Sequence, residues 1–524
     1  MSGAARDLAR AGMVVTGALF VSRILGWVRV AVIAASLGIS RELDIYTAAF
    51  RIPDFLFQLV AAGALASAVI PTIAALVAAD ERDRAWRVVS TMATLLMLVL
   101  AVLLVAMFVA APLLAPLIAP GFDAADLPRL VELTRILLLS PIFLALSAVA
   151  TSILNSAGRF AASVLAPIVY NVVIIVAALT LVPTFGLAGL AWGTVAGALA
   201  TVLVQVAPVV RSVGFRYTPG LDLRDREARR TLALLGPRAI GLAGSQLTLL
   251  LLTMLGSTLV AGAIGAFALA FTIFQIPLGT IAYPLGIVAL PALSRRVAAG
   301  EIDDYVALVT RAVRLLGFTM LPVACIAAGV ALQVVDLVVG FGRVDDAGIA
   351  LTAAAFAGLL AALPTEAVII VLSRAFFAAR NTWIPVGAAM ISVVVAVATA
   401  TLLVGRLGIL GLALGVTVAS WVEAAVLLFA FRSRHAGFGL LRLGRAHLWY
   451  LGAAVAAGLA AGRVHDLAGG SLETDPGIVP SALALGFAGI VGLAVYVGLA
   501  AVLRVPELGA TIRLLRSGLS RGAA

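Results

Sequence analysis

Apolar stretches of about 20 residues or more recur from near Met13 to about Leu503, and charged and turn-forming residues gather in the short segments between them. Each stretch is long enough for a helix to cross the hydrocarbon core of a bilayer, where a helix satisfies its own backbone groups. The pattern predicts an all-α membrane protein with about fourteen spans. Their centres lie near Ser22, Val60, Val102, Phe143, Val172, Val195, Thr248, Leu278, Pro322, Leu359, Val393, Val418, Val455 and Gly489.

The composition agrees with this class, because 63% of the 524 residues are hydrophobic and only 12% are charged. The net charge of +11 is carried by arginine alone. In a soluble protein it would suggest a nucleic-acid partner, but here it follows membrane topology. Arginines cluster before the first span, after the second, after the sixth and after the twelfth. The positive-inside rule therefore predicts that both termini are cytoplasmic.

Three short motifs recur about 220 residues apart, which indicates an internal duplication. The pairs are Phe185–Gly193 with Leu407–Gly415, Ala66–Pro71 with Gly286–Pro291, and Arg51–Pro53 with Gln275–Pro277. Six spans separate equivalent points, so the halves share an orientation and a pseudo-two-fold axis along the membrane normal. We expect six-helix lobes at residues 1–210 and 231–435, an arginine-rich cytoplasmic linker at 211–230, a helix pair at 436–503 and a basic cytoplasmic tail at 504–524.

Five ionisable residues interrupt the first two apolar stretches: Arg23, Arg29, Asp44, Arg51 and Asp54. A charge near the bilayer centre costs at least ~2.5–3.5 kcal/mol, so it usually faces a watery cavity, a partner or a substrate. Seven-residue spacing places Asp44, Arg51 and Gln58 on one stripe of the second span, and Ser22, Gly26 and Arg29 form a similar stripe on the first. The stripes predict a basic cavity wall.

Arginine donates two parallel hydrogen bonds to phosphate and keeps its charge at membrane depth. Arg23 and Arg51, both near mid-depth, are the best candidates for contacts to a diphosphate. The alternative is that the arginines pair with Asp44 and Asp54 and only lock the two helices together. Arg29 with Asp44 would then be an outer latch.

Other chemistry has little support in the sequence. Cys325 stands alone, the three histidines are scattered, and no nucleotide-binding G-x-x-x-x-G-K-[ST] loop occurs. We therefore expect no metal site, no cofactor and no enzymatic activity.

Several motifs resemble the MurJ/MviN family of lipid II flippases. They are V-S-R-I-L-G-W-V-R at Val21–Arg29, L-D-I-Y-T-A-A-F-R-I-P-D-F-L at Leu43–Leu56, A-A-G-A-L-A-S-A-V-I-P at Ala61–Pro71, N-S-A-G-R-F at Asn155–Phe160, A-P-I-V-Y-N-V-V-I-I at Ala166–Ile175 and L-S-R-A-F-F-A-A-R-N-T-W-I-P at Leu372–Pro385. The resemblance covers essentially the whole chain. It implies a central cavity for a disaccharide-pentapeptide diphosphate headgroup, with Arg23, Arg29 and Asp44 at family positions and Arg51 where a basic residue is usual.

The chain also departs from the family pattern at charged positions of the expected anion site. Neutral residues stand there instead, at Val30, Phe57, Gln58, Ala62 and Thr272. Other polar residues are candidates for the same cavity: Asn171, Arg238, Gln246, Gln275 and Glu366.

The leading hypothesis is a flippase that moves a polyprenyl-diphosphate-linked cell-wall precursor, lipid II, across the bacterial inner membrane by alternating access. The membrane potential or a coupling ion would supply the energy. Membrane lipids and cell-wall synthesis proteins are the further partners that the resemblance implies. Two alternatives stay open: a drug or metabolite antiporter of the same superfamily, and a membrane scaffold that has lost transport.

Overall fold

The computed structural model describes residues 3–58, 79–222, 246–467 and 477–509, together with residues 73, 76, 225 and 244. Side chains of the first helix are described from Gly17 onward, except that of Leu19. The chain divides into two compact units, residues 1–265 with 341–345, and residues 266–340 with 346–524. The predicted lobe boundaries at 210 and 231 stay a prediction.

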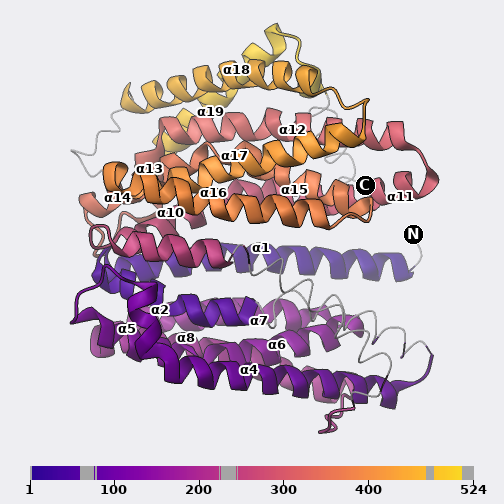
Figure 1. The fold of residues 1–524 in the computed structure, drawn as a ribbon, viewed down its shortest axis with the longest axis vertical. Helices are drawn as coiled ribbons and strands as arrows, with labels where there is room; N and C mark the ends of the chain where they lie inside the picture. Colours follow the sequence, from indigo (N-terminus) through magenta and orange to yellow (C-terminus); the bar gives the residue numbers. More distant parts are fainter. Residues whose placement is uncertain are drawn as a thin grey trace. The chain divides into compact units, whose positions relative to one another are not determined.

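The first unit is built from long helices that run side by side (Figure 1). They are α1 (Gly3–Leu37), α2 (Arg41–Phe57), α4 (Arg82–Ile118), α5 (Asp126–Leu137), α6 (Ser140–Ser156), α7 (Phe160–Thr180) and α8 (Val182–Ala207), which a π-helical turn extends over Pro208–Val213. α7 packs along both α8 and α1, and α5 packs against α2 and α4. Side chains of α2, α4, α5 and α6 form the buried core.

The second unit is also helical throughout its described residues. Its helices are α10 (Ala263–Pro277), whose first turn belongs to the first unit, α11 (Tyr283–Ala299), α12 (Ile302–Gly329), α13 (Ala331–Val339), α14 (Asp346–Leu360), α15 (Leu363–Ala378), α16 (Trp383–Leu407), α17 (Ile409–Arg434), α18 (Leu440–Leu467) and α19 (Ile478–Val502). A π-helical turn over Leu278–Ala282 joins α10 to α11. α16 packs along α17, and α18 packs against both α12 and α19.

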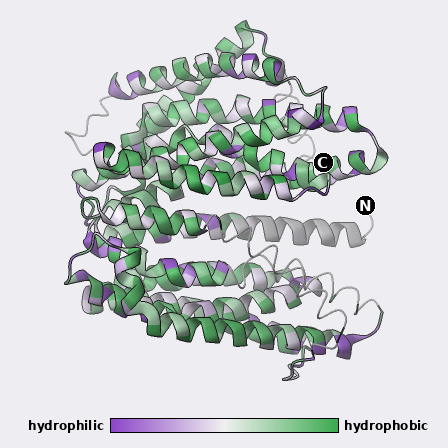
Figure 2. Ribbon diagram, in the orientation of Figure 1, coloured by the Kyte–Doolittle hydropathy of each residue, from purple (hydrophilic) through white to green (hydrophobic). Residues whose placement is uncertain are grey.

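Among the described residues, ten helices are long and apolar enough to cross a membrane, and the bent pair α14 and α15 could form an eleventh span. Each of the ten contains one predicted span centre. Hydrophobic residues run along the helices, and hydrophilic residues lie mostly near helix ends and in loops (Figure 2). The chain is a multi-pass membrane protein, as predicted. The count of fourteen stays a prediction: the predicted centre at Val60 falls outside the described residues, Thr248 lies on a short helix, Gln246–Ser257, and Val455 lies on α18, which is not among the ten.

The internal repeat is visible in the backbone of two hairpins, α7–α8 and α16–α17. Gly186 (φ 57°, ψ −140°) and Gly408 (φ 55°, ψ −132°) adopt almost the same backbone conformation, which residues other than glycine rarely adopt. Both bends bring a second glycine against the preceding helix. A Cβ atom at Gly189 would lie 2.6 Å from the Leu181 carbonyl oxygen, and one at Gly411 would lie 2.8 Å from that of Leu403. The equivalent positions found in the sequence thus form equivalent turns.

Candidate functional site

Arg51, on α2, is held by a neutral hydrogen bond. Its Nε donates to the Oγ1 atom of Thr253 at 2.9 Å. The Thr253 hydroxyl in turn donates to the Leu249 carbonyl oxygen at 2.8 Å, so its oxygen is oriented to accept from the arginine. The contact fixes one edge of the guanidinium on the short helix of residues 246–257.

One turn further along α2, Asp54 is part of an amide network. The Nε2 atom of Gln246 donates to Asp54 Oδ2 at 3.4 Å, and the Gln58 side chain also hydrogen-bonds this carboxylate. Two residues that the sequence singled out as cavity candidates, Gln58 and Gln246, therefore meet at Asp54. The network satisfies the carboxylate with neutral donors.

Arg29, on α1, lies over an aromatic ring. Its guanidinium carbon is 5.4 Å from the centre of the Tyr170 ring on α7, a cation–π geometry. Nearby on α2, Tyr46 shares a 2.9 Å hydrogen bond with Thr194 of α8. Both tyrosines experience the charge of Arg29, so the three side chains form one electrostatic group.

The polar stripe of α1 continues inward to Asn171 of α7. Its Nδ2 atom donates to the Ser22 carbonyl oxygen at 3.2 Å, and a Cβ atom at Gly26 would lie 3.8 Å from the same nitrogen. Ser22, Gly26 and Asn171, which the sequence placed in one cavity, are thus close together. Arg23 is exposed on the same helix.

Asp44 has a different environment from the one that the outer-latch interpretation assigned to it. The carboxylate is fully buried and accepts the backbone N–H groups of Gly262 at 2.7 Å and Gly265 at 2.8 Å. Arg41 is its ion-pair partner, at 3.7 Å. Among the described contacts Asp44 has none with Arg29, so it acts as a cap on the first turn of α10.

The remaining candidates lie in the second unit or outside the described residues. In the second unit, Gln275 is exposed and the Thr272 hydroxyl donates to its own helix at Ala268. Glu366 accepts a 2.6 Å hydrogen bond from Ser420. Arg238 lies outside the described residues. The part that these positions play in binding stays a prediction.

Ion pairing bears on the two interpretations of Arg29 and Arg51, and their roles stay a prediction. Within the described part of the chain, no carboxylate oxygen lies within 4.0 Å of a nitrogen of either side chain. The printed contacts of Arg29 and Arg51 are a ring and a hydroxyl, and Asp54, one turn along α2, interacts with Arg51 by charge from beyond ion-pair distance. Thr253 and Thr194 could not be predicted from the sequence, because an isolated threonine in an apolar helix is usually a packing residue.

Comparison with known proteins identifies the family of this chain. The family model described as "Lipid II flippase MurJ" matches residues 33–468. The chain belongs to the MurJ family.

Relatives support the membership over most of their length. The chain is 28% identical over 436 residues to the lipid II flippase MurJ of Burkholderia cenocepacia, covering 82% of this chain and 84% of the relative. It is 30% identical over 519 residues to the protein of Rhizobium meliloti named "Probable lipid II flippase MurJ", and the match covers 97% of this chain and 96% of the relative.

Solved structures show the same fold. A lipid II flippase MurJ in an inward closed conformation matches with a TM-score of 0.77 at 20% identity, covering 94% of this chain and 98% of the other. An inward-facing multidrug transporter of the MATE family matches with a TM-score of 0.67 at 18% identity, covering 79% and 95%. The MurJ fold is thus shared with exporters of other cargo, which leaves the cargo to be argued from the site.

Proposed function

We propose that this MurJ-family protein moves a polyprenyl-diphosphate-linked peptidoglycan precursor, lipid II, from the inner to the outer leaflet by alternating access. Two relatives carry lipid II flippase in their names, and the family is one of transporters. Arg29 and Arg51 bind the diphosphate while the polyprenyl tail stays in lipid.

The observation that carries this proposal is that, among the described residues, neither Arg29 nor Arg51 forms an ion pair within 4.0 Å, so that Asp54 acts on Arg51 only from a greater distance. An arginine at membrane depth whose charge is not neutralised by protein is stabilised by water or by an anion. Tyr170 and Thr253 hold the two side chains in place through neutral contacts. Such anchoring leaves the remaining N–H donors of each fork for phosphate oxygens, in the planar geometry that suits them.

The energy for transport comes from the membrane potential in this proposal. An anionic headgroup that moves outward through an inside-negative membrane gains ~2.3 kcal/mol per charge per 100 mV. The orientation that this requires, with both termini cytoplasmic in the inner membrane, is the one that the positive-inside rule predicts.

The test is binding of the purified full-length protein to a lipid-linked diphosphate, followed by a flipping assay in vesicles. Arg51→Gln and Arg29→Gln each remove one guanidinium group. Each is expected to weaken binding by about tenfold or more, the loss of a charge-assisted hydrogen bond. Arg87→Gln, at an exposed arginine near the start of α4, is the matched control and should bind as the unmodified chain does.

Three results would contradict the proposal. Equal binding by the Arg29, Arg51 and Arg87 variants would remove the assigned roles. Binding of cationic drugs in place of diphosphates would favour the antiporter, and binding of neither would favour a scaffold without transport.

A further inference from the structure

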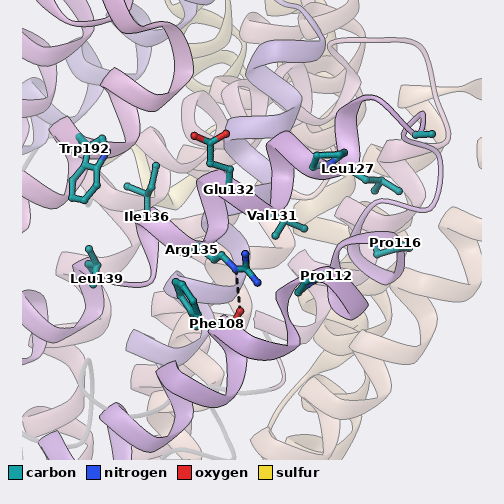
Figure 3. Close-up of a pocket in the computed structure, with 12 residues that line it drawn as sticks. Phe108, Pro112, Pro116, Leu127, Val131, Glu132, Arg135, Ile136, Leu139 and Trp192 are labelled. Carbon is teal, nitrogen blue, oxygen red and sulfur yellow. Dashed lines mark hydrogen bonds between the residues drawn. The ribbon is translucent and has the colours of Figure 1, made fainter.

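A pocket of about 890 Å³ lies on the first unit, and its lining includes none of the candidate-site residues just described. Side chains of α4, of the segment before α5, of α5 itself and of α8 form its walls (Figure 3). Most of these walls are apolar, with Pro112, Leu127, Val131 and Trp192 among them. Its volume is in the range of pockets that hold small ligands.

The pocket opens within the lipid-facing surface of α4. Val105 and Leu113 lie on either side of Phe108 along this helix, and they are 64% and 76% exposed. Exposed apolar side chains of this size on a membrane-spanning helix face acyl chains. The arginine-rich start of α4, at Arg82–Arg87, is at the other end of the helix, so the positive-inside rule places the pocket toward the outer leaflet.

Arg135 enters this apolar surface because of a proline. Pro112 has no backbone N–H, so the carbonyl oxygen of Phe108 lacks its donor within the helix. The Nε atom of Arg135 donates to that oxygen at 3.2 Å, and its guanidinium carbon lies 4.8 Å from the centre of the Phe108 ring. These two contacts fix the guanidinium on the pocket wall (Figure 3).

The terminal amino groups of Arg135 have no hydrogen-bond or ion-pair partner in the described parts of the chain. Glu132, one turn earlier, is exposed and its carboxylate points away from Arg135. Two opposite charges thus line one pocket without neutralising each other. In a lipid environment each requires a counter-charge from outside the protein.

We propose that this pocket binds a membrane phospholipid whose headgroup carries both a phosphate and a primary ammonium group. Arg135 donates from its terminal amino groups to the phosphate oxygens, and Glu132 pairs with the ammonium. The acyl chains lie against the apolar walls. Charge complementarity selects this occupant, because a lipid with only negative charge would be repelled by Glu132.

The experiment is native mass spectrometry of the full-length protein with equal amounts of phosphatidylethanolamine and phosphatidylglycerol, followed by addition of polyprenyl monophosphate as a competitor. The unmodified chain is expected to retain phosphatidylethanolamine preferentially. Arg135→Gln should reduce the bound phosphatidylethanolamine by about tenfold, as expected for the loss of a charge-assisted bond. Arg129→Gln, at an exposed arginine of α5 outside the pocket, should leave it unchanged.

Because Arg135 also supports the Phe108 carbonyl, its replacement could disturb the helix, and a second variant is needed. Glu132→Gln leaves that contact intact and should shift the preference from phosphatidylethanolamine toward phosphatidylglycerol. An unchanged preference in this variant, full retention by Arg135→Gln, or displacement of the phospholipid by equimolar polyprenyl monophosphate would each overturn the proposal. None of these outcomes depends on diphosphate binding at Arg29 and Arg51.

Discussion

Asp44 accepts the backbone N–H of Gly262 at 2.7 Å across 218 residues of sequence. The same carboxylate also accepts the N–H of Gly265, so one buried side chain satisfies two donors at the start of α10. Neither bond has solvent to replace it, because Asp44 is fully buried. The contact joins the start of α2 to the chain that leads into the second unit.

We therefore predict that Asp44→Ala lowers the stability of the protein. Two donors would lose their acceptor in a buried place, and each unsatisfied group costs about 1–3 kcal/mol. The effect is measured by thermal unfolding in detergent, which is detected as the loss of soluble monodisperse protein. Glu42→Ala, at a half-buried residue two positions earlier, is the control. If both variants unfold at the same temperature, the cap contributes nothing.

The hydrogen bond between Arg51 and Thr253 is predicted to act in binding rather than in folding. Thr253→Val keeps the shape of the side chain but removes the acceptor, so the Arg51 fork loses its orientation. Affinity for a lipid-linked diphosphate should fall by about 1 kcal/mol, roughly fivefold.

A double-mutant cycle tests this coupling. In the Arg51→Gln background, Thr253→Val should have almost no further effect on affinity, because the two residues then no longer interact. Additive losses would show that Thr253 acts independently of Arg51.

The bends at Gly186 and Gly408 give a matched pair of predictions. Alanine at either position must adopt a backbone conformation with positive φ that only glycine populates readily, at a cost of about 1–3 kcal/mol. Gly186→Ala and Gly408→Ala should lower the unfolding temperature by similar amounts. Gly387→Ala is the control, because Gly387 is helical and a Cβ atom there meets no neighbour within 4 Å. A large effect at one bend alone would mean that the two hairpins are not equivalent.

A buried carboxylate near the end of the described chain, Glu507, joins α12 and α18 of the second unit. Glu507 forms an ion pair with Arg314 of α12, with 2.6 Å between Oε1 and Nε, and accepts a 2.6 Å hydrogen bond from the hydroxyl of Tyr450 of α18. Tyr450→Phe removes one hydrogen bond and should cost about 1 kcal/mol. Glu507→Gln leaves Arg314 without its counter-charge and should cost more, although the partial exposure of Arg314 reduces the penalty.

Limited proteolysis and thermal unfolding distinguish these variants. The order of stability is expected to be unmodified chain, then Tyr450→Phe, then Glu507→Gln. If Glu507→Gln proves as stable as the unmodified chain, the ion pair between α12 and the segment after α19 does not contribute to stability.

Sequence alone predicted much of the fold because a bilayer imposes a length and a polarity on every span. Each of the ten described helices that could cross a membrane contains one predicted span centre, and the glycine repeat at Phe185–Gly193 and Leu407–Gly415 marks equivalent bends. Partners were harder to predict. Helical spacing indicates which face a residue occupies, but it does not reveal the residue on the facing helix. Thus Gln246 was identified as polar and buried in the membrane, while its bond to Asp54, 192 residues away, required the structure.

Asp44 illustrates the same limit. The expected depth of Asp44 in the bilayer is close to that of Arg29, so the sequence predicts an ion pair between the two charged side chains. Backbone N–H groups of Gly262 and Gly265 provide the bonds instead. Every residue carries such a group, so composition gives no hint of which ones will be available.

The paired bends at Gly186 and Gly408 show which feature the two halves of the chain share and which they do not. The turn persists in both copies because each hairpin needs it sterically. The charge does not persist, since the position matching Arg51 in the other copy is the neutral Gln275. The two hairpins therefore share their backbone geometry, while the charge at the Arg51 position occurs in one half only.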